Sequence, residues 1–350
     1  MASGGDGRLT IIGGGILGLS CAWQALSQGC RVEVIEARAI GAGSSGGHVG
    51  ALAPHVPETW NPKKAFQLDS LLRAEAFWSA VEAASSLPSG YGRTGRVQPV
   101  PDMATADRLA ARVAESRQRW PAGMAMRLTD DPGTGLVPPS PTGLWLRDGL
   151  SARLAPRAAL AALAGAIRRA GGVIREGRTA QPQDIAAPVL WATGTDGLAC
   201  LSRDLGRPVG IGVKGQSALL AHAAPDAPQV FAEGLHIVPH ADGTTAIGST
   251  SETRFVDDRP DHQLDALIAT ARRLCPELAR AEVLDRWAGL RPRAQSRAPL
   301  LGAWPGRPGH FVANGGFKIG FGMAPAIAAV MIDLILTGRD RIPEGFRLAR

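Results

Sequence analysis

The stretch that decides the fold is residues 8–37, RLTIIGGGILGLSCAWQALSQGCRVEVIEA. A short β-rich run, LTII, is followed by three glycines and then by an apolar segment with helical periodicity that ends near Gly29. A second β-branched run, VEVI, ends at Glu36. This order of strand, glycine turn, helix and strand predicts a βαβ unit of the dinucleotide-binding type.

The glycines of the turn match the pattern GxGxxG at Gly13, Gly15 and Gly18. In such units they provide a tight turn, close approach of the backbone to a pyrophosphate, and close packing of helix on strand, and the helix N-terminus holds the phosphates. Glu36 is placed to accept a hydrogen bond from a ribose hydroxyl. A glutamate at this position, rather than a basic residue, argues against the 2′-phosphate of NADP, so FAD or NAD remains.

The composition is that of a soluble chain of about two domains, with 350 residues of which 45% are hydrophobic. We expect no transmembrane segment: the most apolar late stretch, residues 323–336, carries Asp333 and is predicted to be a buried helix. The first residues, MASGGDGR, lack the basic and apolar regions of an export signal. We therefore expect a cytoplasmic protein.

The net charge of +7 does not indicate a nucleic-acid partner. Only four residues are lysine, and the arginines are scattered among Ala, Gly and Pro without interleaved aromatic residues. The cysteines contain no CxxC pair, so we expect reduced thiols and neither a metal site nor a disulfide framework. These cysteines are Cys21, Cys30, Cys200 and Cys275.

A loop rich in Gly and Ser, residues 41–55, follows the first unit. So many glycines indicate that the backbone approaches something closely, and a flat ring system is the obvious candidate. Helices are predicted at residues 66–84 and 105–120, a short strand within 90–101, and irregular structure over 121–141, where Pro and Gly dominate.

The second half of the chain alternates between two patterns. A helix that starts at Pro156, with strands at residues 173–175 and 188–194, adds to the first parallel sheet. Residues 209–253 have short alternating runs that predict an antiparallel sheet with a hairpin turn at 241–243, followed by a helix over 261–274. The C-terminal strand, glycine loop and helix return to the dinucleotide-binding pattern.

Seven segments together resemble the FAD-dependent amino acid and amine oxidoreductases, the group of glycine oxidase, D-amino acid oxidoreductases and sarcosine oxidase. They occur in the right order over almost the whole chain. They are GGGILG with the ribose glutamate, GAGSSGGHVGALAP from residue 41, VLWATG from 189, VKGQ at 213–216, HIVPHADGTTAIGST at 236–250, WAGLRP at 287–292 and GGFKIGFGMAPA at 315–326.

The resemblance implies an α/β fold with a discontinuous, Rossmann-like FAD domain of the glutathione reductase type and an antiparallel-sheet substrate domain that covers the flavin ring. We assign residues 1–60, 145–205 and 285–350 to the FAD domain and residues 61–144 and 206–284 to the substrate domain. Sarcosine oxidases tether FAD through a cysteine that has no counterpart between Arg291 and His310. FAD should therefore be non-covalent.

The resemblance also implies the activity: oxidative deamination or dealkylation of a small amino acid or N-substituted amino acid. Hydride passes from Cα to flavin N5, and the imine is hydrolysed to an oxo acid. The electron acceptor is oxygen or an unidentified carrier. Two alternatives remain open: an oxidase domain acting on a modified tRNA nucleoside, and a non-catalytic flavin subunit of a hetero-oligomeric amine dehydrogenase.

Four residues are candidates for catalysis. Arg291 matches the arginine that holds the substrate carboxylate in glycine oxidase-like enzymes, and its planar guanidinium suits bidentate binding. Lys318 stands where sarcosine oxidases carry a second carboxylate-binding lysine, although a structural ion pair is an alternative. His236 replaces a substrate-contacting tyrosine, and His48 could bind the flavin or deprotonate an ammonium, or be a spectator.

The candidate cofactor-binding residues come from the same motifs. They are Gly13, Gly15, Ile16, Leu17, Gly18, Glu36, Ala37, Ser44, Ser45, Gly47, His48, Val49, Gly50, Ala192, Thr193, Gly194, Gly316, Phe317, Lys318, Ile319 and Gly320.

Overall fold

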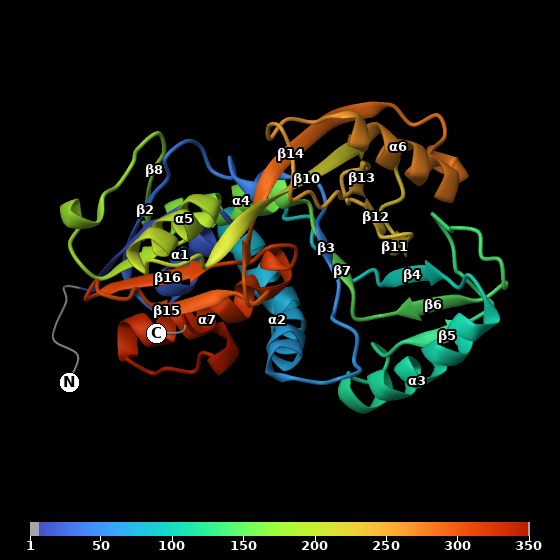
Figure 1. Cartoon of the computed structure of the whole chain (residues 1–350), viewed down its shortest axis with the longest axis horizontal. Helices are drawn as coiled ribbons and strands as arrows, with labels where there is room; N and C mark the ends of the chain where they lie inside the picture. Colours follow the sequence, from blue (N-terminus) through green and yellow to red (C-terminus); the bar gives the residue numbers. More distant parts are fainter. Residues whose placement is uncertain (1–6, 349–350) are drawn as a thin grey trace.

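The computed structural model describes residues 7–348 and contains a six-stranded sheet, an eight-stranded sheet and a small two-stranded sheet (Figure 1). The six-stranded sheet has the order β15-β16-β9-β1-β2-β8, and all its pairings are parallel except that of the edge strand β15. The two strands predicted after the Ala-rich helix are confirmed as members of this sheet. Its strands are β1 (Arg8–Ile12), β2 (Arg31–Ile35), β8 (Val173–Arg175), β9 (Val189–Trp191), β15 (Leu300–Ala303) and β16 (His310–Asn314).

Helices cover both faces of this sheet. On β1, Leu9 and Ile11 belong to the core shared with α1, α4 and α7, whereas Ile12 belongs to the core shared with α5. Burial on both faces explains why β1 is an almost continuous apolar run. The helices are α1 (Ile16–Ser27), α4 (Pro156–Arg169), α5 (Gly194–Asp204) and α7 (Gly320–Thr337), and α2 (Pro62–Ser85) packs on α4 and α7.

The turn between β1 and α1 depends on two of its glycines. Gly13 has φ +114°, and a Cβ there would lie 2.4 Å from the carbonyl oxygen of Ala192. A Cβ on Gly18 would lie 2.0 Å from the carbonyl oxygen of Gly13. The first turn of α1 therefore presses directly on the loop that precedes it, as the glycine pattern predicted.

Helix α7 is the predicted late apolar helix. By length and composition alone it could cross a membrane, but just over half of it (56%) is buried inside the molecule. It packs on α1 and α2, with residues such as Ile327 and Met331 fully buried. These contacts are those of a core helix.

The eight-stranded sheet has the order β14-β10-β13-β12-β11-β4-β6-β5 and is antiparallel except between β4 and β11. Helix α6 (His262–Leu274) covers its β10–β12–β13 part, and α3 (Met103–Arg119) packs on β5. The long strands β10 and β14 extend towards the six-stranded sheet (Figure 1). The strands are β4 (Arg96–Pro99), β5 (Arg127–Thr129), β6 (Trp145–Asp148), β10 (Gly210–Leu220), β11 (Gln229–Ala232), β12 (Leu235–Pro239), β13 (Thr245–Gly248) and β14 (Val283–Ala294).

The remaining elements are short. The two-stranded sheet pairs β3 (Ala51–Leu52) with β7 (Ala152–Arg153). Four 3₁₀ segments complete the described chain: η1 (Ser44–Gly46), η2 (Pro182–Asp184), η3 (Pro276–Leu278) and η4 (Glu344–Phe346).

Two features differ from the sequence prediction. The stretch 121–141 was predicted to be irregular, yet it contains β5, which is held at the sheet edge by pairing with β6, a contact that turn composition does not reveal. The division into two domains remains a proposal, but its borders need adjustment. Strands β6 and β14 hydrogen-bond within the eight-stranded sheet, and α2 packs on the helices of the six-stranded sheet.

Gly18→Ala is expected to lower the melting temperature by several degrees, because the new methyl group overlaps the Gly13 carbonyl and such overpacking costs about 1–3 kcal/mol. Gly345→Ala is the control, since a Cβ there meets no atom within 4 Å. Thermal unfolding of both variants checks this. Equal melting temperatures for the two would contradict the close packing of α1 on its turn.

Candidate active site

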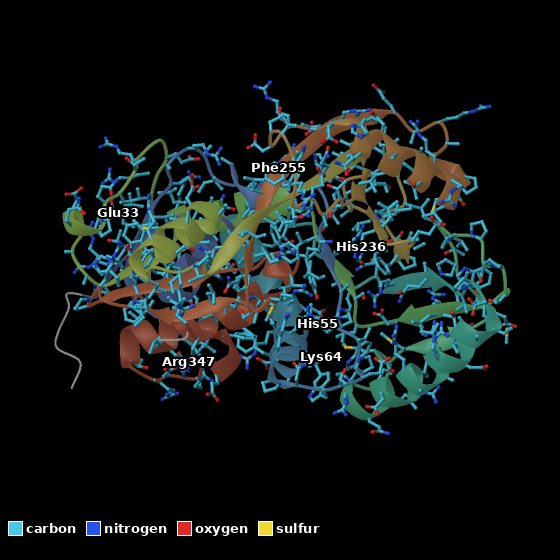
Figure 2. All side chains as sticks on the ribbon, in the orientation of Figure 1. Glu33, His55, Lys64, His236, Phe255 and Arg347 are labelled. Atoms are coloured by element: carbon cyan, nitrogen blue, oxygen red, sulfur yellow. The ribbon has the colours of Figure 1, made fainter. Side chains whose placement is uncertain are left out.

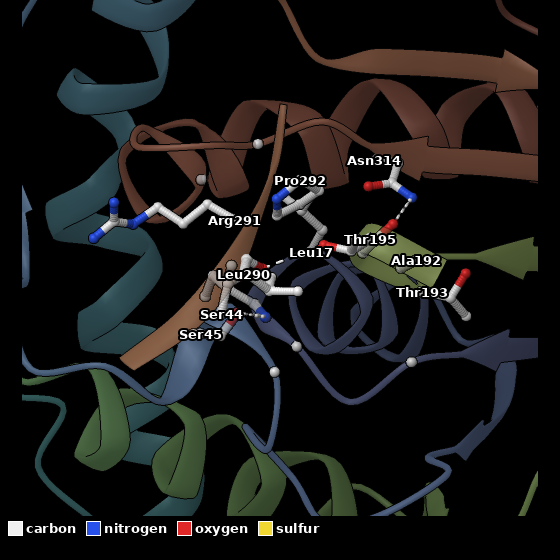
Figure 3. Close-up of a pocket in the computed structure, with 18 of the residues that line it drawn as sticks. Leu17, Ser44, Ser45, Ala192, Thr193, Thr195, Leu290, Arg291, Pro292 and Asn314 are labelled. Carbon is white, nitrogen blue, oxygen red and sulfur yellow. Dashed lines mark hydrogen bonds between the residues drawn. The ribbon is translucent and has the colours of Figure 1, made fainter. Parts of the chain in front are cut away.

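A cavity of about 1050 Å³ opens at the carboxyl ends of the parallel strands. Ile12, Ile35, Trp191 and Asn314, the last residues of β1, β2, β9 and β16, all line it. In open α/β sheets, ligands bind at this edge. Strand β14 closes the cavity from the eight-stranded sheet with Leu290, Arg291 and Pro292 (Figure 3).

Most of the predicted cofactor residues line this cavity. Four do not: Gly18, His48, Gly50 and Ile319, of which Gly18 packs on the turn and Gly50 on the backbone of Leu154. The residues in the cavity wall are Gly13, Gly15, Ile16, Leu17, Glu36, Ala37, Ser44, Ser45, Gly47, Val49, Ala192, Thr193, Gly194, Gly316, Phe317, Lys318 and Gly320.

The wall formed by α1 suits the pyrophosphate of a dinucleotide. Helix α1 has Gly15 as its N-cap, and Gly15, Ile16 and Leu17 face the cavity with the positive end of the helix. Ser45 closes one side, since its Oγ accepts a hydrogen bond from Ile16 N at 3.1 Å. A Cβ on Gly15 would lie only 3.1 Å from that oxygen, so the glycine leaves the approach to the helix end open.

The Glu36 carboxylate is fixed at the end of β2. Its Oε2 accepts from Gly14 N at 2.7 Å and its Oε1 accepts from Arg38 N at 2.9 Å. The carboxylate therefore stands rigidly at the cavity wall, where this fold places a ribose. The volume of the cavity, about 1050 Å³, and the chemistry of its wall fit FAD.

Arg291 is buried, with 9% of its surface exposed, and lines the cavity from β14. Its Nη1 donates to the carbonyl oxygen of Thr250 at 3.0 Å. Burial lowers the pKa of Arg291 to about 10, with Glu252 opposing the shift, so the guanidinium stays charged at neutral pH. Among residues 7–348, no carboxylate lies within ion-pair distance of it.

Lys318 contributes a second cation to the cavity wall. Its Nζ lies 5.9 Å from the centre of the Phe317 ring, and the described residues offer it no carboxylate within ion-pair distance. Burial lowers the pKa of Lys318, and the charge of Arg291 lowers it further. The alternative of a structural ion pair for Lys318 finds no partner in the described part of the chain.

His236 lies on β12 in the part of the molecule that holds the eight-stranded sheet (Figure 2), and it lines the cavity. Its ring packs on Phe231 with centroids 4.6 Å apart, and its buried Nδ1 has no hydrogen-bond partner among the described residues. Burial lowers the pKa of His236 to about 3, with Arg96 and Lys318 adding to the effect. The imidazole is therefore neutral at physiological pH.

His48 is buried outside the cavity wall. Its Nδ1 lies 3.2 Å from Ser217 Oγ and its Nε2 lies 3.1 Å from Asp285 Oδ2. Asp285 also accepts from Arg157 Nη1 at 2.7 Å, and Arg157 Nε donates to the Gly46 carbonyl at 2.8 Å. The predicted catalytic role of His48 has no geometric support. The contacts instead fasten the glycine-rich loop to β14.

Several site residues were not predicted from the sequence. Gly215 lies beneath the Arg291 guanidinium, and the carbonyl oxygen of Thr250 holds that group. At the other side of the cavity, Asn314 Nδ2 donates to the Gly194 carbonyl at 2.8 Å (Figure 3). VKGQ was noted as a motif. Neither spacing nor residue type indicated that its glycine, Gly215, lies against the distant Arg291.

The fold and the cavity define an α/β protein of the dinucleotide-binding class. The profile of the FAD dependent oxidoreductase family matches residues 8–334, and the chain belongs to this family. It is accordingly an FAD-dependent oxidoreductase.

The chain is similar to glycine oxidases. It is 25% identical over 387 aligned positions to the glycine oxidase of Geobacillus kaustophilus, covering 97% of this chain and 95% of the relative. With the Pseudomonas aeruginosa glycine oxidase it is 37% identical over 148 positions, about two fifths of each chain (40%).

Two solved structures show the same fold. The crystal structure of the Geobacillus kaustophilus glycine oxidase aligns with a TM-score of 0.85 at 23% identity, covering 98% of this chain and 99% of that one. The iminodiacetate oxidase of a Chelativorans species aligns with a TM-score of 0.83 at 20% identity, covering 97% of this chain and 98% of that one.

The low pKa of His236 predicts a pH-dependent stability. In the unfolded chain this histidine takes up a proton near pH 6.5, whereas in the folded chain it does so only near pH 3. Its contribution to stability is complete above about pH 6.5 and is lost as the pH falls towards 3, by up to about 1.4 kcal/mol per pH unit. His236→Asn should therefore lose less stability than the wild type between pH 7 and pH 5 in urea unfolding. Parallel pH profiles would contradict the burial of a neutral imidazole.

Proposed function

We propose that the protein oxidises a small amino acid or an N-substituted amino acid whose carboxylate is held by Arg291. The observation that carries this proposal is a buried guanidinium that finds no carboxylate partner among residues 7–348, in the wall of a cavity that fits FAD. The N-terminus of α1 and Glu36 would hold FAD, which would supply the redox chemistry as the acceptor, at N5, of the hydride that leaves the substrate Cα. Water would hydrolyse the resulting imine to an oxo acid and ammonia or an amine.

Arg291 and Lys318 have complementary parts in this proposal. The planar guanidinium matches a carboxylate with two parallel hydrogen bonds and so sets the direction of the substrate. The lysine ammonium is a point charge that strengthens anion binding without imposing a plane. A substrate held at its carboxylate has little freedom left, which presents Cα in one orientation.

The protonation states of the histidines near the site favour a substrate whose amine is neutral when it reacts. With a pKa of about 3, His236 is a weak base at neutral pH, and His48 is turned to Ser217 and Asp285. Two neighbouring cations also disfavour an ammonium in the cavity. The neutral imidazole of His236 offers a hydrogen-bonding atom for a polar part of the substrate, in the position where the related family has a tyrosine.

The relatives suggest the first substrates to test. Glycine oxidases act on glycine by name, and one structural neighbour is named for iminodiacetate. Oxygen and a separate carrier are both candidate acceptors, and a cytoplasmic location stays a prediction. The tRNA nucleoside oxidase and the non-catalytic subunit become outcomes of the experiment below.

Arg291→Ala should raise the apparent substrate constant about a hundredfold or more, because a charged, bidentate contact worth several kcal/mol is lost. The measurement is anaerobic bleaching of the flavin band with glycine, sarcosine, iminodiacetate, proline and D-amino acids, followed by admission of air. Arg286→Ala is the matched control, since Arg286 lies on the same strand but pairs with Asp265 at the surface.

Either of two results would contradict the proposal. The first is an Arg291→Ala variant with an unchanged substrate constant. The second is a yellow protein that no compound on the panel bleaches, which would favour a nucleoside substrate or a subunit that needs a partner.

The non-covalent attachment of FAD gives a separate prediction. No cysteine occurs in residues 292–309, where sarcosine oxidases carry their tether. Acid precipitation of the purified yellow protein should therefore leave the flavin in the supernatant, as measured by its absorbance. Flavin that remains in the washed pellet would show a covalent bond.

A further inference from the structure

A buried charged cluster lies on the face of β10 opposite Arg291. Lys214, only 1% exposed, places its Nζ 2.7 Å from Asp261 Oδ2 and 3.8 Å from Glu252 Oε2. Gln216, fully buried, donates from Nε2 to Glu252 Oε1 at 2.9 Å and to Asp261 Oδ1 at 2.8 Å. We call Lys214, Gln216, Glu252 and Asp261 the β10 cluster. Charges are costly to bury, and their close mutual pairing offsets that cost.

The β10 cluster also holds the backbone around it. Gln216 Oε1 accepts from Asp261 N at 2.8 Å, and Asp261 caps α6 by accepting from Gln263 N at 2.9 Å. Lys214 and Glu252 exchange backbone hydrogen bonds of 3.0 and 2.9 Å. The segment after β13 is therefore tied along the edge of β10.

Thr250 connects the β10 cluster to the cavity. Its Oγ1 accepts from Gln216 N at 2.9 Å and donates to Glu252. Its carbonyl oxygen accepts from Arg291 Nη1 at 3.0 Å. One residue thus carries both the contact with the cluster and the only hydrogen bond that the described chain gives the guanidinium.

Gly215 provides the space for Arg291. Successive residues of a strand face opposite sides, so Gly215 faces away from Lys214 and Gln216 and towards the cavity. A Cβ on Gly215 would lie 2.0 Å from Cζ of Arg291. The guanidinium is therefore confined between the backbone of β10 and the Thr250 carbonyl.

We propose that the β10 cluster positions Arg291 for carboxylate binding by holding Thr250 in place. An arginine side chain has several rotatable bonds, and ordering them when a ligand binds lowers the affinity. The affinity is higher when contacts within the protein already hold the side chain in its binding conformation. The inference rests on the proposed function, since it assumes that Arg291 binds the substrate carboxylate. The residues of the cluster are positioning residues and do not line the cavity.

Thr250→Val tests the proposal, because it removes both Oγ1 hydrogen bonds and keeps the shape and the carbonyl group. The measured quantity is the dissociation constant of acetate for the FAD-loaded protein. Acetate binding is monitored by the change that acetate causes in the flavin absorbance spectrum. We expect acetate to bind about tenfold more weakly, a change that corresponds to roughly one hydrogen bond to a charged group. The FAD content should be unchanged. Thr250→Ser keeps the hydroxyl and should restore the wild-type constant.

Thr245→Val is the matched control. Thr245 is fully buried in β13 and donates from Oγ1 to the His222 carbonyl at 2.8 Å, away from Arg291. This variant should lose stability without a change in acetate binding. If Thr250→Val does not fold, Thr250→Ala carries the same test, because it also removes the hydroxyl and keeps the carbonyl group.

The outcomes separate the two claims. Two outcomes overturn the positioning role and leave the proposed function standing. In the first, Arg291→Ala loses acetate binding but Thr250→Val binds acetate as the wild type does. In the second, Thr245→Val weakens acetate binding as much as Thr250→Val does. Acetate binding that is absent in the wild type, or unaffected in Arg291→Ala, overturns the proposed function and the positioning role together.

Discussion

Arg291 is a buried cation that the described chain provides with a carbonyl oxygen but with no carboxylate. Desolvation of a charge is expensive, and a buried guanidinium that stays charged carries this cost until a partner offsets it. The rest of the site is arranged around this constraint: Gly215 makes room for the guanidinium, Thr250 orients it, and Lys318 adds a second positive charge. Under the proposed function, the substrate carboxylate offsets this cost.

The cavity exists because two sheets meet at one place. The six-stranded sheet brings its carboxyl ends and the N-terminus of α1 to the cavity, which suits a dinucleotide. Strand β14 brings Arg291 from the eight-stranded sheet, and the contacts of Asp285 with His48 and Arg157 fasten the glycine-rich loop to the same strand. The glycine-rich loop and Arg291 are therefore held by a single element, β14.

Local signals predicted much of this arrangement. The turn at Gly13 and Gly18, the parallel strands near residues 173 and 189, and the helix over 261–274 follow from glycine spacing, β-branched runs and periodicity, all of which act over a few residues. Strand β5 was missed because it depends on pairing with β6. For His48 the sequence left flavin binding, a catalytic role and a spectator role open, because a histidine in a glycine-rich loop carries no sign of the direction in which its ring will point.

By itself the sequence determined the dinucleotide unit and the glutamate that ends its second strand, because both depend on residue type and short spacing. The resemblance to the family, carried by seven ordered motifs, singled out Arg291. Only the tertiary structure decided which of these groups share a cavity. It paired His48 with Ser217 and Asp285, left His236 neutral, and set Lys214 and Gln216 behind Arg291. Burial and pairing across distant strands set the charge and direction of a side chain, and these emerge only when the chain has folded.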